Sequence, residues 1–231
     1  MKLVALLPMK ANSERIKGKN FKNLGGKPLF RWVLDKLLAV DEVDLVVINT
    51  DARDILIKNG LVESSKILIR DRKNEICGDH ISMNLVIEDD VKNIDADLYL
   101  MTHTTNPFLS KNSIEKGISQ LTAAVKNESA DSLFTVNKVQ ERFYTKEASP
   151  INHDPDNLIR TQDLDPWYSE NSNLYIFNKK SFLTTNARIG LNPIMLETPP
   201  YESIDIDNPE DWDLAEVMIE YYKKKESRFD L

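Results

Sequence analysis

Two aspartates separated by one residue lie near the end of the chain, in the segment Ser203 to Asp207 (SIDID). We expect this segment to form a short strand. Side chains alternate along a strand, so Asp205 and Asp207 would share one face, with roughly 6.6 Å between their Cα atoms. Mg²⁺ binds such carboxylates together with substrate phosphates and water. The pair is therefore a candidate Mg²⁺ site, with two solvated acids as the alternative.

A basic segment near the N-terminus could bind the matching anion. Residues 10 to 27 include one acid, Glu14, and six cationic residues, which are Lys10, Arg15, Lys17, Lys19, Lys22 and Lys27. Backbone N–H groups of an irregular loop can form an anion-binding nest, and the cations would neutralise further charge. No P-loop and no G-x-G-x-x-G pattern occurs. The segment predicts either a polyphosphate site or a mobile basic loop without a ligand.

The whole chain excludes several other classes of protein. Its formal net charge of −7 argues against a nucleic-acid binder, which usually presents a basic surface. No stretch approaches the roughly 18 unbroken apolar residues of a membrane span, and the apolar start is too short for a signal peptide. Cys77 is the single cysteine, so an internal disulfide is excluded. We expect a cytoplasmic protein that binds a small anion, and neither a membrane nor nucleic acid.

The elements that must position these residues alternate between strands and helices. We expect strands at residues 2–8, 43–48, 66–69, 97–101, 132–136 and 173–177, and helices at 28–40, 52–59, 82–92, 110–125 and 209–222. Such alternation predicts an α/β, Rossmann-like fold, with a mostly parallel sheet and helices on both faces. Ligands of such sheets bind beyond the carboxyl ends of the strands. The loops after Leu7, Ile48 and Met101 should therefore line the site.

Residues 137–170 interrupt this alternation with prolines and many polar residues. Loops of this length in compact domains are usually functional lids, interface arms or disordered segments. The sequence therefore predicts one domain over residues 1–231 that carries an inserted arm at 137–170.

The loop after the first strand, Pro8 to Asn20 (PMKANSERIKGKN), resembles a family signature. It is similar to P-A-R-G-G-S-K-G-I-P-G-K-N of the cytidylyltransferases that make CMP-sialic acid and CMP-Kdo. Lys10 stands in place of the phosphate-binding arginine of that family, Glu14 in place of a lysine and Arg15 in place of a glycine. The resemblance implies that Lys10 and Lys19 are catalytic. It also implies that the nucleotide contacts Pro8, Met9, Lys10, Ser13, Arg15, Lys19 and Asn20.

The resemblance continues through two further segments. Thr50 and Asp51 match the S-T-D of the family, and Arg72 to Asp79 (RKNEICGD) is similar to R-P-x-E-L-A-x-D. This implies that Arg72 and the backbone of residues 77–79 face the cytosine. The nucleotide-binding residues implied here are Asp51, Arg72, Cys77, Gly78, Asp79 and Ser82. Without a group nearby to lower its pKa, Cys77 is better interpreted as a small packed residue than as a nucleophile.

Two later segments resemble the acceptor side of the family. Thr102 to Leu109 (THTTNPFL) is similar to L-Q-P-T-S-P-L-R, with His103 in place of the glutamine, and Arg160 to Tyr175 is similar to R-x-Q-D-L-P-x-x-Y-x-x-N-G-x-x-Y. The resemblance implies that Arg160 and Gln162 bind either the sugar carboxylate or a partner subunit. The candidate acceptor-binding residues are His103, Thr105, Asn106, Arg160, Gln162, Asn171 and Tyr175.

The family also carries S-I-D-I-D near its end, which supports Mg²⁺ on Asp205 and Asp207. The resemblance implies a cytidylyltransferase that transfers CMP from CTP to a sugar acid, with release of diphosphate, as a homodimer in which an arm of each subunit reaches the neighbour. One alternative is a nucleotide-sugar-dependent glycosyltransferase, but the D-x-D pair of that class normally follows a mid-chain strand. The second alternative is a non-catalytic nucleotide-binding homologue, suggested by the substitutions at Lys10, Glu14, Arg15 and His103.

Overall fold

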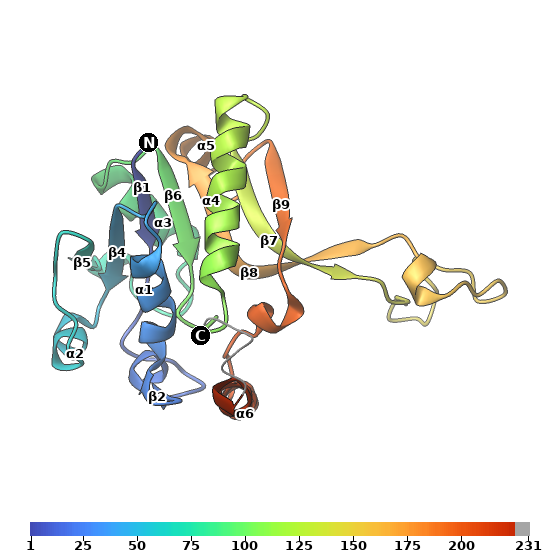
Figure 1. The fold of residues 1–231 in the computed structure, drawn as a ribbon, viewed down its shortest axis with the longest axis horizontal. Helices are drawn as coiled ribbons and strands as arrows, with labels where there is room; N and C mark the ends of the chain where they lie inside the picture. The colour runs from blue at the N-terminus through green and yellow to red at the C-terminus, as the bar shows by residue number, and fades with distance from the viewer. Residues whose placement is uncertain (225–231) are drawn as a thin grey trace.

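The computed structural model describes residues 1–224 and has a seven-stranded sheet as its centre (Figure 1). The order of the strands is β5-β4-β1-β6-β8-β7-β9. Their bounds are Leu3–Leu6 (β1), Leu45–Thr50 (β4), Ile67–Asp71 (β5), Leu98–Thr102 (β6), Ser132–Val139 (β7), Trp167–Asn178 (β8) and Pro193–Glu197 (β9). In this sheet β8 pairs antiparallel with both of its neighbours, and the other pairings are parallel. The predicted mostly parallel α/β sheet is confirmed.

Helices cover both faces of the sheet, as expected (Figure 1). The helices are Leu29–Ala39 (α1), Arg53–Lys58 (α2), Met83–Asn93 (α3), Lys111–Lys126 (α4), Lys179–Thr185 (α5) and Pro209–Lys224 (α6). The short 3₁₀ helices are Lys19–Phe21 (η1), Asn74–Ile76 (η2), Thr161–Asp163 (η3) and Pro200–Ser203 (η4), and a small hairpin joins Asn23–Leu24 (β2) to Lys27–Pro28 (β3). Within the described range, no helix has both the length and the apolar character needed to cross a bilayer.

The core consists of two layers on either side of the sheet. Phe30 of α1 and Ile114 of α4 pack with residues of one face, whereas Ile87 of α3 and Phe182 of α5 pack with residues of the other. All four residues of β1 are buried, because this strand has neighbours on both sides and helices on both faces. A third cluster packs α6 against the β2–β3 hairpin through Trp212, Ile219 and Leu24, among other residues. The last helix is therefore fixed beside the N-terminal loop.

The predicted strand at residues 203–207 is wrong. Residues 204–207 have no strand partner and form an extended connection into α6. Their backbone N–H groups make separate hydrogen bonds instead of a strand ladder. The N–H of Ile206 donates to the carbonyl of Thr105 (2.8 Å), and the N–H of Asp207 donates to the carboxylate of Asp211 (2.8 Å). Asp205 and Asp207 therefore lie on a connecting segment rather than on one face of a strand.

One strand of the main sheet, β9, and one α-helix, α5, were missing from the prediction. β9 is an edge strand with mostly exposed or half-exposed side chains, so its sequence lacks a continuous buried run. α5 has only seven residues, so its hydrophobic pattern does not repeat often enough to predict a helix. Its N-cap is Asn178, whose side chain accepts from the N–H of Ser181 (2.7 Å).

The insertion projects from the sheet as an arm between β7 and β8 (Figure 1). The two strands pair from Ser132↔Phe177 to Val139↔Trp167, and residues 140–166 continue beyond them. Phe143 stacks on Trp167 with ring centroids 5.0 Å apart, which orders the base of the arm. The arm is thus an extended hairpin rather than a loop folded over its own domain.

Candidate functional site

A pocket of about 310 Å³ lies beyond the carboxyl ends of β1, β5 and β6. The loop after β1 and the loop after β6 line it, as the sequence predicted, and residues after β5 complete it. The lining residues that the sequence had singled out are Pro8, Met9, Lys10, Ser13, Arg15, Lys19, Asn20, Arg72, Gly78, Asp79, His103, Thr105 and Asp207.

The basic N-terminal loop contacts Asp207, which lies near the other end of the sequence. Gly18, in a left-handed conformation, precedes the η1 turn that starts at Lys19. The ammonium of the buried Lys19 donates to the carbonyl of Ile206 (2.5 Å) and lies 3.2 Å from the Asp207 carboxylate. The other carboxylate oxygen of Asp207 is 3.1 Å from the Arg15 guanidinium. The structure therefore brings the basic N-terminal loop and the second aspartate of SIDID into direct contact.

Asp205 lies beside this junction but does not line the pocket. Partial desolvation raises the pKa of Asp205, the neighbouring Asp207 charge raises it further, and a hydrogen bond with Thr105 lowers it. Asp211 fixes the next turn, because its carboxylate accepts from the N–H groups of Asp207 and Asn208 while its own N–H donates to the side chain of Asn208. This capping box at the start of α6 holds the aspartates in place.

Lys10 also lines the pocket, and its ammonium pairs with the Asp79 carboxylate. The Lys10 hydrogen bond and charge lower the pKa of Asp79. Asn20 holds the backbone of Lys10 through its amide (2.9 Å) and accepts from the hydroxyl of Thr104 (2.7 Å). The cationic loop is thus tied to the end of β6.

Arg72 is held by a chain of hydrogen bonds that starts in the core. Its Nε donates to the Asn49 side chain (3.0 Å), and one Nη donates to the backbone carbonyls of Asn49 (2.9 Å) and Met9 (3.3 Å). The Asn49 amide donates in turn to the buried Asp90 carboxylate of α3 (2.9 Å). Burial lowers the pKa of Arg72 and raises the pKa of Asp90 to about 6. The guanidinium therefore borders the pocket in a defined orientation.

Six lining residues were missed by the sequence analysis as ligand contacts. They are Glu14, Ile76, Ile81, Met83, Val86 and Thr104. Four of them are apolar and surround the predicted nucleotide segment 77–82, and their position next to that segment is the signal that could have found them. These four apolar side chains give the pocket an apolar part of its lining, which suits the flat face of a base.

Three predicted nucleotide contacts lie outside this pocket. Asp51 and Cys77 line an adjoining cavity of about 470 Å³, which also includes Arg72. Asp51 accepts from the N–H of Ala11 (2.7 Å), so it orders the basic loop. Ser82 caps α3 by accepting from the N–H of Asn84.

The predicted acceptor residues are divided between several places. The amide of Asn171 donates to Asn137, Thr198 and Ser203. Asn106 is fully buried, and neither side-chain polar atom has a hydrogen-bond partner within residues 1–224. Neither residue lines the pocket, so the structure does not bring them to the nucleotide loop.

Arg160 and Gln162 lie on the arm, which projects away from the pocket-bearing sheet (Figure 1). The Arg160 guanidinium is exposed and pairs with Asp163 (2.7 Å). A single chain therefore does not place these two residues in its own pocket.

His103 contacts a cation that the sequence analysis did not single out. One nitrogen of Arg188 lies 3.4 Å from Nε2 of His103, and the guanidinium lies over the ring of Tyr175, 4.2 Å from its centroid. Burial, together with the charges of Arg188 and Lys19, lowers the pKa of His103 to about 4, and the Asp207 charge opposes this shift. His103 is therefore neutral at pH 7. Arg188 follows α5, which was itself not predicted, so no sequence signal linked it to the site.

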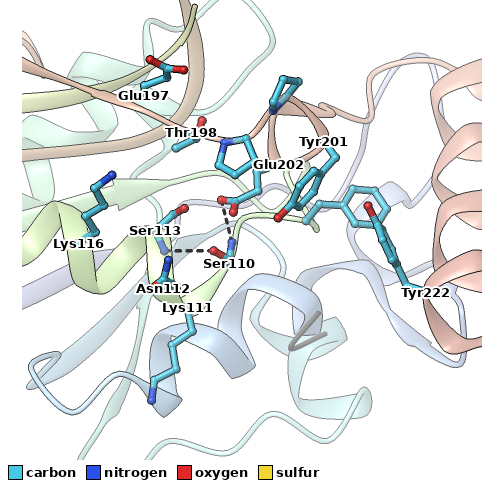
Figure 2. Close-up of a pocket in the computed structure, with 13 residues that line it drawn as sticks. Ser110, Lys111, Asn112, Ser113, Lys116, Glu197, Thr198, Tyr201, Glu202 and Tyr222 are labelled. Atoms are coloured by element: carbon cyan, nitrogen blue, oxygen red, sulfur yellow. Dashed lines mark hydrogen bonds between the residues drawn. The ribbon is translucent and has the colours of Figure 1, made fainter. Parts of the chain in front are cut away.

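A larger cavity of about 560 Å³ is separate from this site (Figure 2). It lies at the start of α4, where the carboxylate of Glu202 accepts from the N–H of Ser110 (3.1 Å), and none of its lining residues lines the cationic pocket. Its size alone does not make it the candidate site, because the cations gathered by the N-terminal loop line the smaller pocket.

A mostly parallel sheet with a cationic pocket at the carboxyl ends of its strands defines a nucleotide-binding α/β protein. The sequence matches the family described as cytidylyltransferase over residues 4–229, and the chain belongs to this family. It is therefore a nucleotidyltransferase, and the glycosyltransferase alternative loses its support.

Individual relatives agree with this assignment. The chain is 26% identical to a CMP-N,N'-diacetyllegionaminic acid synthase of Legionella pneumophila, over 95% of this chain and 97% of the relative. It is 27% identical to an N-acylneuraminate cytidylyltransferase of Oncorhynchus mykiss over 94% of this chain, which spans half of that longer protein. A solved CMP:2-keto-3-deoxy-manno-octonic acid synthetase complexed with CTP has the same fold, with a TM-score of 0.68, 15% identity and coverage of 96% of this chain and 99% of that chain.

Proposed function

We propose that this chain transfers CMP from CTP to a 2-keto sugar acid and releases diphosphate. The observation that carries the proposal is the contact of Arg15 and Lys19 with Asp207 at the mouth of the pocket. It places positive charge for a triphosphate beside a carboxylate that could hold its counter-ion. The relatives whose names include legionaminic and neuraminic acids support a sugar acid as the acceptor.

The pocket supports nucleotide binding through two kinds of lining residue. Lys10, Arg15 and Lys19 supply positive charge, and apolar side chains near Gly78 supply a surface for a base. Arg72 also lines the pocket, and its fixed guanidinium is suited to read the polar edge of the cytosine ring.

The donor set at Asp205 and Asp207 suits Mg²⁺. Mg²⁺ in nucleotide sites is usually bound by one or two carboxylates together with substrate phosphates and water, and these two aspartates can supply the carboxylates. Asp207 lines the pocket. Asp205 lies close enough to Asp207 that the charge of Asp207 raises the pKa of Asp205. When bound, the ion would neutralise phosphate charge and polarise an oxygen.

In the proposed reaction the acceptor hydroxyl oxygen attacks the α-phosphorus of CTP and loses its proton. The bond from that phosphorus to the bridging oxygen breaks, and diphosphate leaves with the additional negative charge. Lys10, Arg15 and Lys19 lie where they can offset this charge. Positioned cations, rather than a single general base, are expected to supply most of the rate enhancement.

The test is replacement of Asp207 by asparagine, with diphosphate release measured from CTP, Mg²⁺ and a panel of sialic, legionaminic and pseudaminic acids and Kdo. The mass of the CMP-sugar product identifies the acceptor. We expect Asp207→Asn to lower turnover by at least about 100-fold, since a removed charge stabiliser costs on that order. The exposed Asp213→Asn on α6 is the matched control. Near-normal turnover of Asp207→Asn refutes the metal role, and a wild type that turns over none of the acids leaves the non-catalytic alternative.

We also propose that the enzyme acts as a homodimer through its arm. The arm and its base carry six exposed apolar or aromatic side chains, which are Tyr144, Ile151, Leu158, Ile159, Trp167 and Tyr168. A narrow hairpin cannot bury them by itself, and exposed apolar groups of this kind mark interaction surfaces. A partner subunit would bury them, and Arg160 and Gln162 would then face the partner rather than their own pocket.

A further inference from the structure

Arg188 is a half-buried cation next to the candidate site, and it makes no ion pair with a carboxylate of residues 1–224. It contacts the Met101 sulfur (3.8 Å), Nε2 of His103 (3.4 Å) and the face of the Tyr175 ring (4.2 Å to the centroid). Each of these partners is uncharged, since burial keeps His103 neutral at pH 7. Half-buried arginines usually have an anionic partner, so this arrangement leaves a charge to be matched.

The contacts fix the guanidinium while leaving much of it free. Its central carbon lies over the Tyr175 ring, and the two hydrogen bonds use a single terminal nitrogen, Nη1. A guanidinium has five N–H donors, so an edge that includes Nη2 remains available for a bidentate bond to a carboxylate. Tyr175 is itself held, because its hydroxyl donates to the Glu170 carboxylate and accepts from the hydroxyl of Ser172.

Arg188 borders the cationic pocket through its contact with His103. His103 lines the cationic pocket together with Thr105, whose carbonyl holds the segment of Asp205 and Asp207. Arg188 does not itself line the pocket, so its contact with His103 places it directly behind that lining residue. Nε2 of His103 accepts from Arg188, which leaves the proton of the neutral ring on Nδ1 as a further donor.

We propose that Arg188 binds the carboxylate of the acceptor sugar acid, in a subsite that it forms with His103 and Tyr175. This inference rests on the proposed transfer of CMP to a sugar acid. It differs from what the family resemblance implies for Arg160, which the fold places on the projecting arm. Arg188 recognises the acceptor, so its removal should affect acceptor binding much more than nucleotide binding.

The experiment compares the wild type with Arg188→Gln and Arg188→Lys, with diphosphate release as the readout and the panel acid of highest wild-type kcat/KM as the acceptor. We expect Arg188→Gln to raise the acceptor KM at least 20-fold while the KM for CTP stays within twofold. Arg188→Lys should be intermediate, because it keeps the charge but loses the planar fork. Arg31→Gln on α1, another half-buried arginine, is the matched control and should leave both KM values unchanged.

The C1 carboxamide of the same acid separates recognition from folding. Wild type should lose at least 20-fold in kcat/KM with the carboxamide, whereas Arg188→Gln should lose less than threefold, since the partner of the carboxylate is already absent. An acceptor KM of Arg188→Gln within threefold of wild type, or an equal rise in the KM for CTP, overturns the subsite while the proposed function stands. If the wild type turns over no panel acid and none of them raises its unfolding temperature, both proposals are overturned.

Discussion

Asp207 is the residue on which the chemistry of the site converges. It faces one cation of the N-terminal loop through each carboxylate oxygen, so its side chain and that loop restrain each other. Asp205 is two residues away in a more crowded position, where partial desolvation raises its pKa. The two aspartates of SIDID are thus physically unequal, and we expect Asp207 to be the more sensitive to substitution.

The lowered pKa of His103 predicts how stability depends on pH. The folded chain keeps the ring neutral down to about pH 4, whereas the unfolded chain protonates it near pH 6.5. Within this window the unfolded state binds the additional proton, so stability falls as pH decreases. His103→Gln should reduce that slope by up to about 1.4 kcal/mol per pH unit, measured from urea unfolding at pH 7, 6 and 5.

The buried Asp90 acts in the opposite direction, because the folded state holds its proton up to about pH 6. This contribution is present in both proteins and cancels in the difference between them. Equal slopes for wild type and His103→Gln would contradict the assignment of a neutral, buried imidazole.

Asn49 should position Arg72 rather than touch the substrate. Asn49→Ala removes the side-chain acceptor of Arg72 and leaves Asp90 without its amide donor. Loss of a hydrogen bond to a charged group costs about 1.5–3 kcal/mol, so we expect the KM for CTP to rise about tenfold or more. Asn93→Ala is the control, since its amide bonds Asp89 of the same helix away from Arg72. If the KM for CTP is unchanged and only the unfolding midpoint falls, Asn49 contributes to stability and does not position Arg72 for CTP.

At the scale of elements, the β2–β3 hairpin and α6 form one unit that supports both ends of the site. The ammonium of Lys223 bonds the carbonyl of Gly25 in the turn, and Ile219 and Trp212 pack against residues of the hairpin region. This packing joins the basic loop before the hairpin to the SIDID segment before the helix. The geometry at Asp207 therefore depends on a contact between elements about 190 residues apart in the chain.

Gly25 should be the most sensitive point of this contact. Its φ is +61°, and a Cβ there would lie 2.6 Å from Cγ2 of Ile219. Gly25→Ala therefore adds a clash to the strain of a left-handed alanine, and we expect a loss of about 2–4 kcal/mol in urea unfolding. Gly18→Ala is the matched control, because Gly18 has the same φ of +61° but open space where a Cβ would lie. It should cost only about 1–2 kcal/mol. Equal losses would show that Ile219 moves away and that the contact is not tight.

At the scale of the whole molecule, the arm is the feature that a single chain leaves incomplete. The sheet and its helices form a closed core, whereas residues 140–166 extend from it with exposed apolar side chains (Figure 1). If the arm joins two subunits, disrupting its surface should change assembly and leave the core intact.

Light scattering should give a mass twice the 26.5 kDa of one chain. Leu158→Asp combined with Ile159→Asp should give the single-chain mass, since charges would replace side chains that are 61% and 46% exposed. Val62→Asp, at a position 73% exposed on the body, should leave the larger mass unchanged. A wild type that remains at 26.5 kDa at working concentration would count against the dimer.

The sequence by itself determined the fold class and the location of the charged loop. Long, regularly spaced elements such as α1 and α4 carry their own periodic signal, and buried parallel strands such as β1 and β4 appear as apolar runs. Local hydrophobic pattern is sufficient for such elements. The sequence also predicted the motifs within short loops, such as Lys10 to Lys19 and Arg72 to Asp79, because their residues are close together in the chain.

Tertiary structure decided what depends on contacts between distant segments. The predicted strand at residues 203–207 is an extended connection, because no neighbouring strand is available to pair with it and Thr105 and Asp211 satisfy its backbone instead. Arg188 reaches His103 from a connection between two elements that have no strong sequence signal. Arg160 is separated from its own pocket by the direction of the arm. Such relations arise from packing in three dimensions, which the order of residues along the chain does not record.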